Sequence, residues 1–348
     1  MDKEYPPELD NPRLIYNKAQ EFIKYQDYQS ALSLLRTLME SEEFSALSYF
    51  HIAGIANIFG DAKYASECFY KAFEIDPSLN RKVLQKGHHL ELHSYTEMDG
   101  RRNSKCPLCG GYGEPYWCYY IAVRVNCPKY FNPIRTWLYC KKCHHLFSAE
   151  PTEYREDDMS LLHINHTKAN PSRFPLYSRI LNSFRGSAQG NALLEVGVGT
   201  GECVAAAKEM GYDVTGIDIT KQNVDYVNNT FGLNVIHGDF LNFPFKKLFD
   251  IIIMGDVIEH VNNPHDFIKK ANELSHPGSV LWVSTPNFES TYTQLAGHSD
   301  PMRYEPSHCG YFSSKSLSNL LGAYGFDVIN YEISAQYYGS MEITAVKR

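Results

Sequence analysis

The stretch that decides the fold is Ala192-Leu-Leu-Glu-Val-Gly-Val-Gly-Thr-Gly201. Its apolar start predicts a buried strand, its glycines predict a tight turn, and residues 202–210 have the composition of a helix. Glycine lets the backbone approach a ligand where a side chain would collide. A second strand-like run ends at Asp218, where α/β nucleotide sites place the carboxylate that binds ribose hydroxyls. This stretch therefore predicts a strand–loop–helix site for a nucleoside-containing ligand.

The loop spacing is Gly-x-Gly-x-Gly, with Glu195 two residues before the first glycine, and it departs from the Gly-x-Gly-x-x-Gly dinucleotide fingerprint. It resembles the first motif of class I S-adenosylmethionine-dependent methyltransferases. The resemblance implies that the loop holds the methionyl part of S-adenosyl-L-methionine and that Asp218 holds the ribose. It also implies that Asp239 accepts a hydrogen bond from the adenine amino group and that Phe240 lies against the ring. Asn170-Pro-Ser-Arg173 separately resembles the lead-in of some small-molecule methyltransferases, which implies that Arg173 meets the cofactor carboxylate. The full set of implied cofactor-binding residues is Glu195, Gly197, Gly199, Thr200, Gly201, Asp218, Ile219, Asp239, Phe240, Gly255, Asp256 and Arg173.

Apolar strand-like runs alternate with helical segments across residues 191–348, which predicts a mainly parallel sheet with helices on both faces. The predicted strands are 192–196, 213–217, 234–236, 250–254, 279–284, 327–332 and 342–347. The last two are too close for a crossover helix, so they predict an antiparallel hairpin at one edge. The expected fold class is α/β, with the seven-stranded, mostly parallel sheet of class I methyltransferases, plus an N-terminal helical-repeat segment and a small β-rich zinc ribbon.

The predicted chemistry centres on Asp256, Glu259 and His260, which follow the fourth strand and share one face of a helical turn by their spacing. His308 arrives later in the chain. Histidine titrates near neutrality, so His260 is predicted as a general base that takes a proton from a hydroxyl or amine. His308 is predicted to position the substrate or share that role, and Asp256 and Glu259 to orient the imidazole. The alternative is that Glu259 and His260 only order the turn.

The same residues resemble two groups of enzymes. One is the ubiquinone-pathway type of O-methyltransferase, which acts on small molecules. The other is the small-RNA terminal ribose methyltransferases, whose Glu-x-x-Glu-His and later histidine bind a divalent ion. This chain has Asp256 where the second group has glutamate. A divalent ion at Asp256, Glu259, His260 and His308 is therefore a further expectation.

Two Cys-x-x-Cys pairs lie upstream, Cys106 with Cys109 and Cys140 with Cys143, and strand-forming residues 119–125 and 136–139 lie between them. The spacing resembles a zinc ribbon, in which four thiolates close a tetrahedral structural zinc site. Two unconnected thiol pairs are the alternative. If one ligand is misassigned, the substitutes are Cys118, Cys127, His144 and His145.

Residues 11–77 have helical patterning, and a shift of 34 residues superposes Ala19 on Ala53 and Ala31 on Ala65. This period resembles tetratricopeptide helix pairs, with a plain helical bundle as the alternative, and either favours a protein partner. The predicted organisation is a helical segment at 1–100, a zinc ribbon at 101–150, a linker with a lead-in helix at 151–190 and a methyltransferase domain at 191–348.

Charge and hydropathy limit the partners. The formal net charge is −7, which disfavours extended nucleic-acid contact, and no apolar run is long enough to span a membrane, so a cytoplasmic protein is expected. The ribbon alone carries eight Lys and Arg against two Glu, with nearby aromatic side chains as stacking candidates. The leading hypothesis is O-methylation of a small-molecule or biosynthetic intermediate, anionic or carrier-attached. The alternatives are an RNA or protein acceptor read by the ribbon, and a non-catalytic scaffold.

Overall fold

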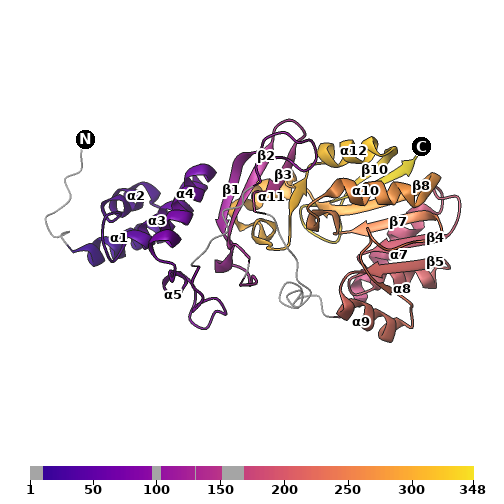
Figure 1. Ribbon diagram of the computed structural model, residues 1–348, viewed down its shortest axis with the longest axis horizontal. Helices are drawn as coiled ribbons and strands as arrows, with labels where there is room; N and C mark the ends of the chain where they lie inside the picture. Colours follow the sequence, from indigo (N-terminus) through magenta and orange to yellow (C-terminus); the bar gives the residue numbers. More distant parts are fainter. Residues whose placement is uncertain (1–10, 96–102, 130, 151–167) are drawn as a thin grey trace.

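The computed structural model describes residues 11–95, 103–129, 131–150 and 168–348. Figure 1 shows three parts along the longest axis: helices at the N-terminal end, a small β-sheet in the middle and a larger sheet covered by helices at the other end. Residues 151–167 of the predicted linker, together with Arg101, Arg102 and Tyr130 of the predicted ribbon, lie outside the described residues.

The N-terminal part consists of helices that pack in pairs. They are α1 (Pro12–Lys24), α2 (Tyr28–Thr37), α3 (Ser45–Ile58), α4 (Ala62–Ile75) and the short α5 (Asn80–Val83). Asp27 and Asp61 cap α2 and α4 by accepting hydrogen bonds from backbone N–H groups, and they lie 34 residues apart in the sequence. Ala19, Ala31, Ala53 and Ala65 have no exposed surface. Small side chains allow these helices to cross closely, and the tetratricopeptide assignment remains a prediction.

The middle part is a four-stranded antiparallel sheet in the order β1-β2-β3-β9. Its strands are β1 (Glu114–Tyr120), β2 (Ile134–Cys140), β3 (His145–Ser148) and β9 (Gly310–Phe312), and the last comes from the C-terminal part of the chain. The predicted strand at 119–125 is displaced, because Ile121–Val123 forms a 3-10 turn whose residues Ile121 and Ala122 are buried. We call residues 103–150 the cysteine module.

The C-terminal part contains the predicted seven-stranded sheet, in the order β10-β11-β8-β7-β4-β5-β6. Its strands are β4 (Ala192–Val196), β5 (Asp213–Asp218), β6 (Ile236–His237), β7 (Phe249–Gly255), β8 (Ser275–Pro286), β10 (Phe326–Ile333) and β11 (Ser340–Lys347). Neighbouring strands pair in parallel from β8 to β6, whereas β11 pairs antiparallel with both β8 and β10. The mostly parallel sheet with an antiparallel edge is therefore confirmed.

Helices cover both faces of this sheet because neighbouring strand residues point to opposite sides. Leu193 packs in one cluster with residues of α7 (Phe174–Phe184) and α8 (Glu202–Glu209). Leu194 packs in another with residues of α10 (Pro264–Glu273) and α12 (Ser314–Ala323). The remaining helices of this part are α9 (Lys221–Phe231) and α11 (Thr291–Ala296).

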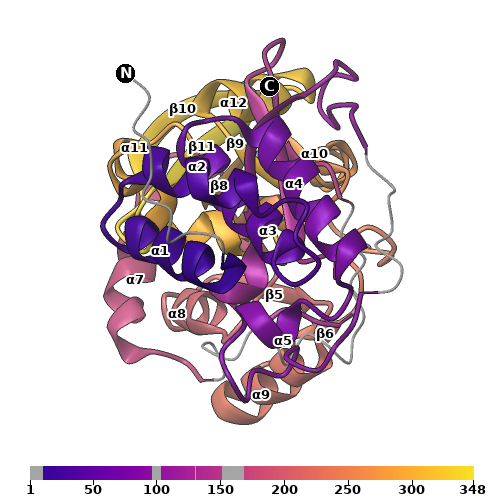
Figure 2. The same cartoon turned by 90° about the vertical axis from the view of Figure 1, so that its left-hand side faces the viewer.

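One hydrophobic core joins the N-terminal helices, the cysteine module and residues from the C-terminal part. Trp117, Tyr119 and Tyr120 of β1 are buried in it together with Tyr304 and Tyr311. The sequence suggested several of these aromatic side chains as stacking candidates for a substrate, and this is corrected here, since Trp117, Tyr119, Tyr120 and Phe131 are all less than 10% exposed. Figure 2 shows the N-terminal helices from the side that faces away from the larger sheet. Within the described ranges, no helix is both long and apolar enough to cross a membrane.

Candidate active site

The glycine loop after β4 has the backbone conformation that its sequence predicts. Gly197, Gly199 and Gly201 have φ angles of 72°, 53° and 86°, a region that favours glycine. A Cβ atom at Gly199 would meet no protein atom within 4 Å, whereas one at Gly201 would lie 2.6 Å from Val227. Gly201 therefore allows tight packing on α9, and Gly199 leaves the backbone open to a ligand.

Two carboxylates flank this loop. Asp218, at the end of β5, accepts hydrogen bonds from the backbone N–H groups of Gly199 (3.0 Å) and Thr220 (2.7 Å). Glu195 is 5% exposed, and its Oε2 atom has no hydrogen-bond partner among the residues that the structure describes. Burial raises the pKa of both acids. A buried carboxylate oxygen of this kind fits the ammonium group of S-adenosylmethionine, since buried polar atoms otherwise have partners.

Hydrogen bonds through Glu202 connect the segment before α7 to the glycine loop. The N–H of Asn170 donates to Oε1 of Glu202 (2.8 Å), whose other oxygen accepts from the Thr200 hydroxyl (2.7 Å). Arg173 donates to the hydroxyl of Tyr337 (2.9 Å), and its charge acts on Asp256. The structure therefore places Thr200 within the loop and Arg173 near Tyr337 and Asp256, and their cofactor contacts remain predictions.

The predicted adenine end lies after β6. Asp239 accepts a hydrogen bond from the N–H of Leu241 (2.9 Å) and another from the amide of Asn242. Phe240 is 4% exposed and packs against core side chains, so its contact with adenine remains a prediction. Ile219 is 63% exposed and is the most accessible apolar side chain of the predicted cofactor set.

β7 ends at Gly255, and the turn that follows holds Asp256 in a strained conformation, with φ of 53°. Its carboxylate accepts a hydrogen bond from the hydroxyl of Ser284 (3.1 Å). Burial raises the pKa of Asp256 to about 6, while the Ser284 bond and the nearby Arg173 oppose this change. The side chain is therefore held in one place between β7 and β8.

Glu259, His260 and His308 form a cluster beyond this turn. One ligand-type atom of each lies within 4.8 Å of the others. Glu259 is 1% exposed and accepts a hydrogen bond from the hydroxyl of Thr285 (2.9 Å). Burial and the nearby charge of Asp256 raise the pKa of Glu259 well above its usual value. Asp256 is not a member of this cluster, so the predicted four-residue set is reduced to three.

Hydrogen bonds orient both imidazoles. Nδ1 of His260 lies 3.3 Å from the carbonyl oxygen of Ser307, which can only accept, so Nδ1 of the neutral ring carries the hydrogen. Nδ1 of His308 lies 2.9 Å from the hydroxyl of Tyr311, which itself donates to the carbonyl oxygen of Met302. In both neutral rings the lone pair is therefore on Nε2. This arrangement suits proton removal and also suits metal binding.

Sequence reasoning missed the groups that support the predicted residues. The side chains of Ser284, Thr285 and Tyr311 and the main-chain carbonyl of Ser307 contact Asp256, Glu259, His308 and His260 respectively, but single polar residues at strand ends and in loops carry no motif. Their only sequence signal is their position directly after predicted strands or beside His308, where a ligand site of this fold would lie.

The four module cysteines also come together. Their Sγ atoms lie within 4.8 Å of one another, with 3.4 Å between Cys106 and Cys143 and 3.5 Å between Cys109 and Cys140. Four sulfurs at zinc–sulfur distances of about 2.3 Å would lie about 3.8 Å apart in a tetrahedron, so the cluster fits zinc. The proposed substitutes Cys118 and Cys127 are buried in the core shared with the helices.

Comparison with known proteins shows which family the C-terminal part of the chain resembles. Residues 169–331 match a family described as a methyltransferase domain. This region is a methyltransferase domain. It resembles an uncharacterized methyltransferase from Staphylococcus carnosus, with 32% identity over 147 residues, 41% of this chain and 65% of that protein. It also resembles a ubiquinone biosynthesis O-methyltransferase from Rickettsia canadensis, with 26% identity over 138 residues, 38% of this chain and 57% of that protein.

Among solved structures, magnesium protoporphyrin IX methyltransferase from Synechocystis, crystallised with S-adenosylhomocysteine, aligns with a TM-score of 0.42 and 17% identity. The alignment covers 57% of this chain and 90% of that one. The chain spans less than two thirds of the length of the curated relatives named above. The methyltransferase domain is thus matched, and the helices and the cysteine module lie outside the matched residues.

Proposed function

We propose that this protein transfers the methyl group of S-adenosyl-L-methionine to an oxygen atom of a small-molecule or biosynthetic intermediate, with His260 as the general base. The observation that carries the proposal is the pair of oriented imidazoles, His260 and His308, whose rings lie 4.6 Å apart in the turn that follows β7 and in the segment before β9. Relatives named ubiquinone biosynthesis O-methyltransferase support an oxygen acceptor.

The residues have the following roles in this proposal. S-adenosylmethionine, when bound, supplies a methyl group on a positively charged sulfur. The acceptor hydroxyl forms a C–O bond as the C–S bond breaks, and its proton passes to Nε2 of His260. His308 holds the acceptor oxygen near this atom, and Asp256 and Glu259 fix the turn. Alignment of this kind can contribute several kcal/mol to the reduction of the barrier.

A divalent ion at Glu259, His260 and His308 is a second use of the same side chains, favoured by their clustering. A carboxylate and two neutral imidazoles form a donor set that suits zinc, iron or another transition metal ion. Such an ion would bind the acceptor oxygen and lower its pKa. Metal analysis of the protein with Cys109→Ser, which removes the module site, would separate this site from the cysteine cluster: retained metal that is lost on adding His308→Ala supports it.

Cofactor binding is tested by titration calorimetry with S-adenosylhomocysteine. Asp218→Ala is expected to weaken binding, while Asp213→Ala, an exposed carboxylate at the start of the same strand, serves as the matched control. His260→Ala is expected to keep binding and to abolish turnover. Equal loss of binding in Asp218→Ala and His260→Ala would contradict the assignment of the base.

The acceptor can be found with an isotopically labelled methyl donor. Mass spectrometry of a metabolite extract incubated with the protein should show a labelled product that is absent with His260→Ala. Label in RNA or protein alone would instead favour the alternative acceptors. Failure of the folded protein to bind either S-adenosylmethionine or S-adenosylhomocysteine would refute the proposed function.

A further inference from the structure

The strand that follows His308 belongs to the sheet of the cysteine module. β9 pairs antiparallel with β3, with Leu146 opposite Tyr311 and Phe147 opposite Gly310. The N–H of Ser148 also donates to the carbonyl oxygen of Cys309 (2.9 Å). The backbone of this histidine segment is therefore held by the module, while the N–H of Cys309 donates to the carbonyl oxygen of Glu259 (2.6 Å) on the other side.

Arg135 of β2 makes a direct contact with this segment. It is 2% exposed, and its Nη2 atom donates to the carbonyl oxygen of His308 (2.7 Å). Burying a guanidinium group is costly unless it is hydrogen-bonded. Arg135 is one of the eight basic residues that the sequence assigns to the ribbon, and its burial removes it from any exposed basic surface of the module.

A second contact from β2 acts on the imidazole of His308 through Tyr311. The ring of Trp137 lies 4.5 Å from the ring of Tyr311, whose hydroxyl accepts the hydrogen bond from Nδ1 of His308. The indole N–H of Trp137 donates to the carbonyl oxygen of Arg303 in the preceding segment (3.4 Å). Two residues of one module strand thus fix both the backbone and the ring orientation of His308.

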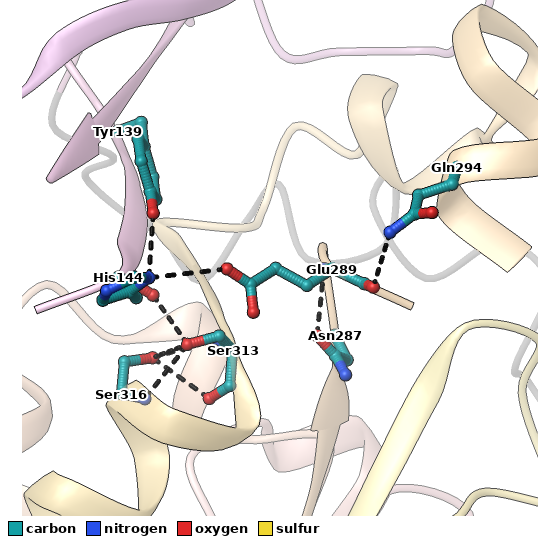
Figure 3. A network of polar contacts seen from close by, with 7 residues as sticks. All are labelled: Tyr139, His144, Asn287, Glu289, Gln294, Ser313 and Ser316. Atoms are coloured by element: carbon teal, nitrogen blue, oxygen red, sulfur yellow. Dashed lines mark hydrogen bonds and ion pairs between the residues drawn. The ribbon is translucent and has the colours of Figure 1, made fainter. Parts of the chain in front are cut away.

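The turn that carries Cys140 and Cys143 is joined to the same region through His144, as Figure 3 shows. The hydroxyl of Ser313, which caps α12, donates to the carbonyl oxygen of His144 (2.8 Å). Nδ1 of His144 contacts the hydroxyl of Tyr139 (3.0 Å) and lies 3.8 Å from Glu289. Cys140 ends β2 and Cys143 lies two residues before β3 begins at His145, so the cysteine cluster sits at the turn that connects these two strands.

We infer that the cysteine module positions the acceptor-side histidine: Arg135 is a positioning residue for His308, and zinc bound by the four cysteines holds the β2–β3 hairpin that carries this contact. The inference rests on the proposed function for its catalytic meaning. The contacts between the cysteine module and β9 do not depend on which acceptor is methylated. The contacts of Arg135, Trp137 and Ser313 named above involve neither the glycine loop after β4 nor Asp218 at the end of β5, so cofactor binding should not depend on them.

The test compares Arg135→Gln with Lys142→Gln, which changes an exposed residue between Cys140 and Cys143 and serves as the control. Hydrogen exchange followed by mass spectrometry should show about tenfold faster exchange in peptides covering residues 308–312 of Arg135→Gln, with residues 192–218 unchanged. The rate of methyl transfer at saturating cofactor should fall about tenfold, while affinity for S-adenosylhomocysteine stays within about twofold. Wild-type exchange and wild-type transfer rates in Arg135→Gln would overturn the inference.

Removing zinc from the wild-type protein with a chelator provides a second arm, which decides the matter if Arg135→Gln does not fold. The same pattern is expected: faster exchange at 308–312, unchanged exchange at 192–218 and retained S-adenosylhomocysteine binding. Unchanged exchange at 308–312 after zinc removal, or purified protein without zinc, would overturn the metal part. If the wild-type protein binds no cofactor, the proposed function fails, but the exchange measurements still judge the positioning of β9.

Discussion

Replacing Gly199 by alanine should separate two roles of the glycine loop. The residue has a φ of 53°, and a side chain in this left-handed region costs about 1–2 kcal/mol. A Cβ atom there would meet no protein atom within 4 Å, so no steric cost from the protein adds to this value. Gly211 is the matched control, because it has a φ of 88° with equally open surroundings but lies after α8, away from the loop.

Both variants should therefore lose about 1–2 kcal/mol of the free energy of unfolding, measured by urea denaturation. Only Gly199→Ala should lose affinity for S-adenosylhomocysteine, because its new methyl group points where the ligand approaches. A loss of about tenfold, or about 1.4 kcal/mol, is expected by calorimetry. Equal affinities in Gly199→Ala and Gly211→Ala would refute the placement of the ligand over this loop.

Three further predictions concern the scaffold. The carbonyl of Pro277 and the carboxylate of Asp250 raise the pKa of His276 above 6.5. Their interaction with the protonated imidazole should therefore stabilise the folded protein fully below pH 6.5, and this contribution should be lost as pH rises through the raised pKa. His276→Gln should reduce the difference between the free energies of unfolding at pH 6 and pH 8.5 by less than about 1 kcal/mol, measured by urea denaturation. An unchanged difference between the two pH values would contradict this prediction. Gly113→Ala should cost about 1–3 kcal/mol, because its Cβ would lie 2.7 Å from that of Leu138. Cys109→Ser should remove the zinc of the cysteine module in elemental analysis, and undiminished zinc would contradict the ligand set.

The larger sheet could be predicted from the sequence because its signals are local. The runs at 192–196 and 213–217 match the observed strands β4 and β5 to within one residue. In β4 the match follows from burial on both faces, because Leu193, Leu194 and Val196 are all buried and apolar. The four cysteines could be predicted as one metal site because the Cys-x-x-Cys spacing of each pair is a local signal. The glycines of the loop also predicted a tight turn, and their φ angles lie in the left-handed region that favours glycine.

The supporting contacts of the site could not be predicted, because they join residues far apart in the chain. Arg135 and His308 are separated by 173 positions, and nothing in either local sequence indicates the other. The aromatic strand β1 was ambiguous for a different reason. A run rich in tyrosine and tryptophan has the same pattern whether it faces a ligand or a protein core, and here Trp117 and Tyr120 face the core.

The pairing of β3 with β9 has a consequence for how this chain could be recombined with others. The matched region, residues 169–331, would be taken for a domain that can be exchanged by itself if only its match were considered. However, β9 within it pairs with residues 145–148, which lie outside the match. A methyltransferase domain grafted in its place from a relative would have to supply a strand that pairs with residues 145–148 as β9 does. Exchange of acceptor preference between such proteins would therefore require the module and the segment before α12 to be moved together.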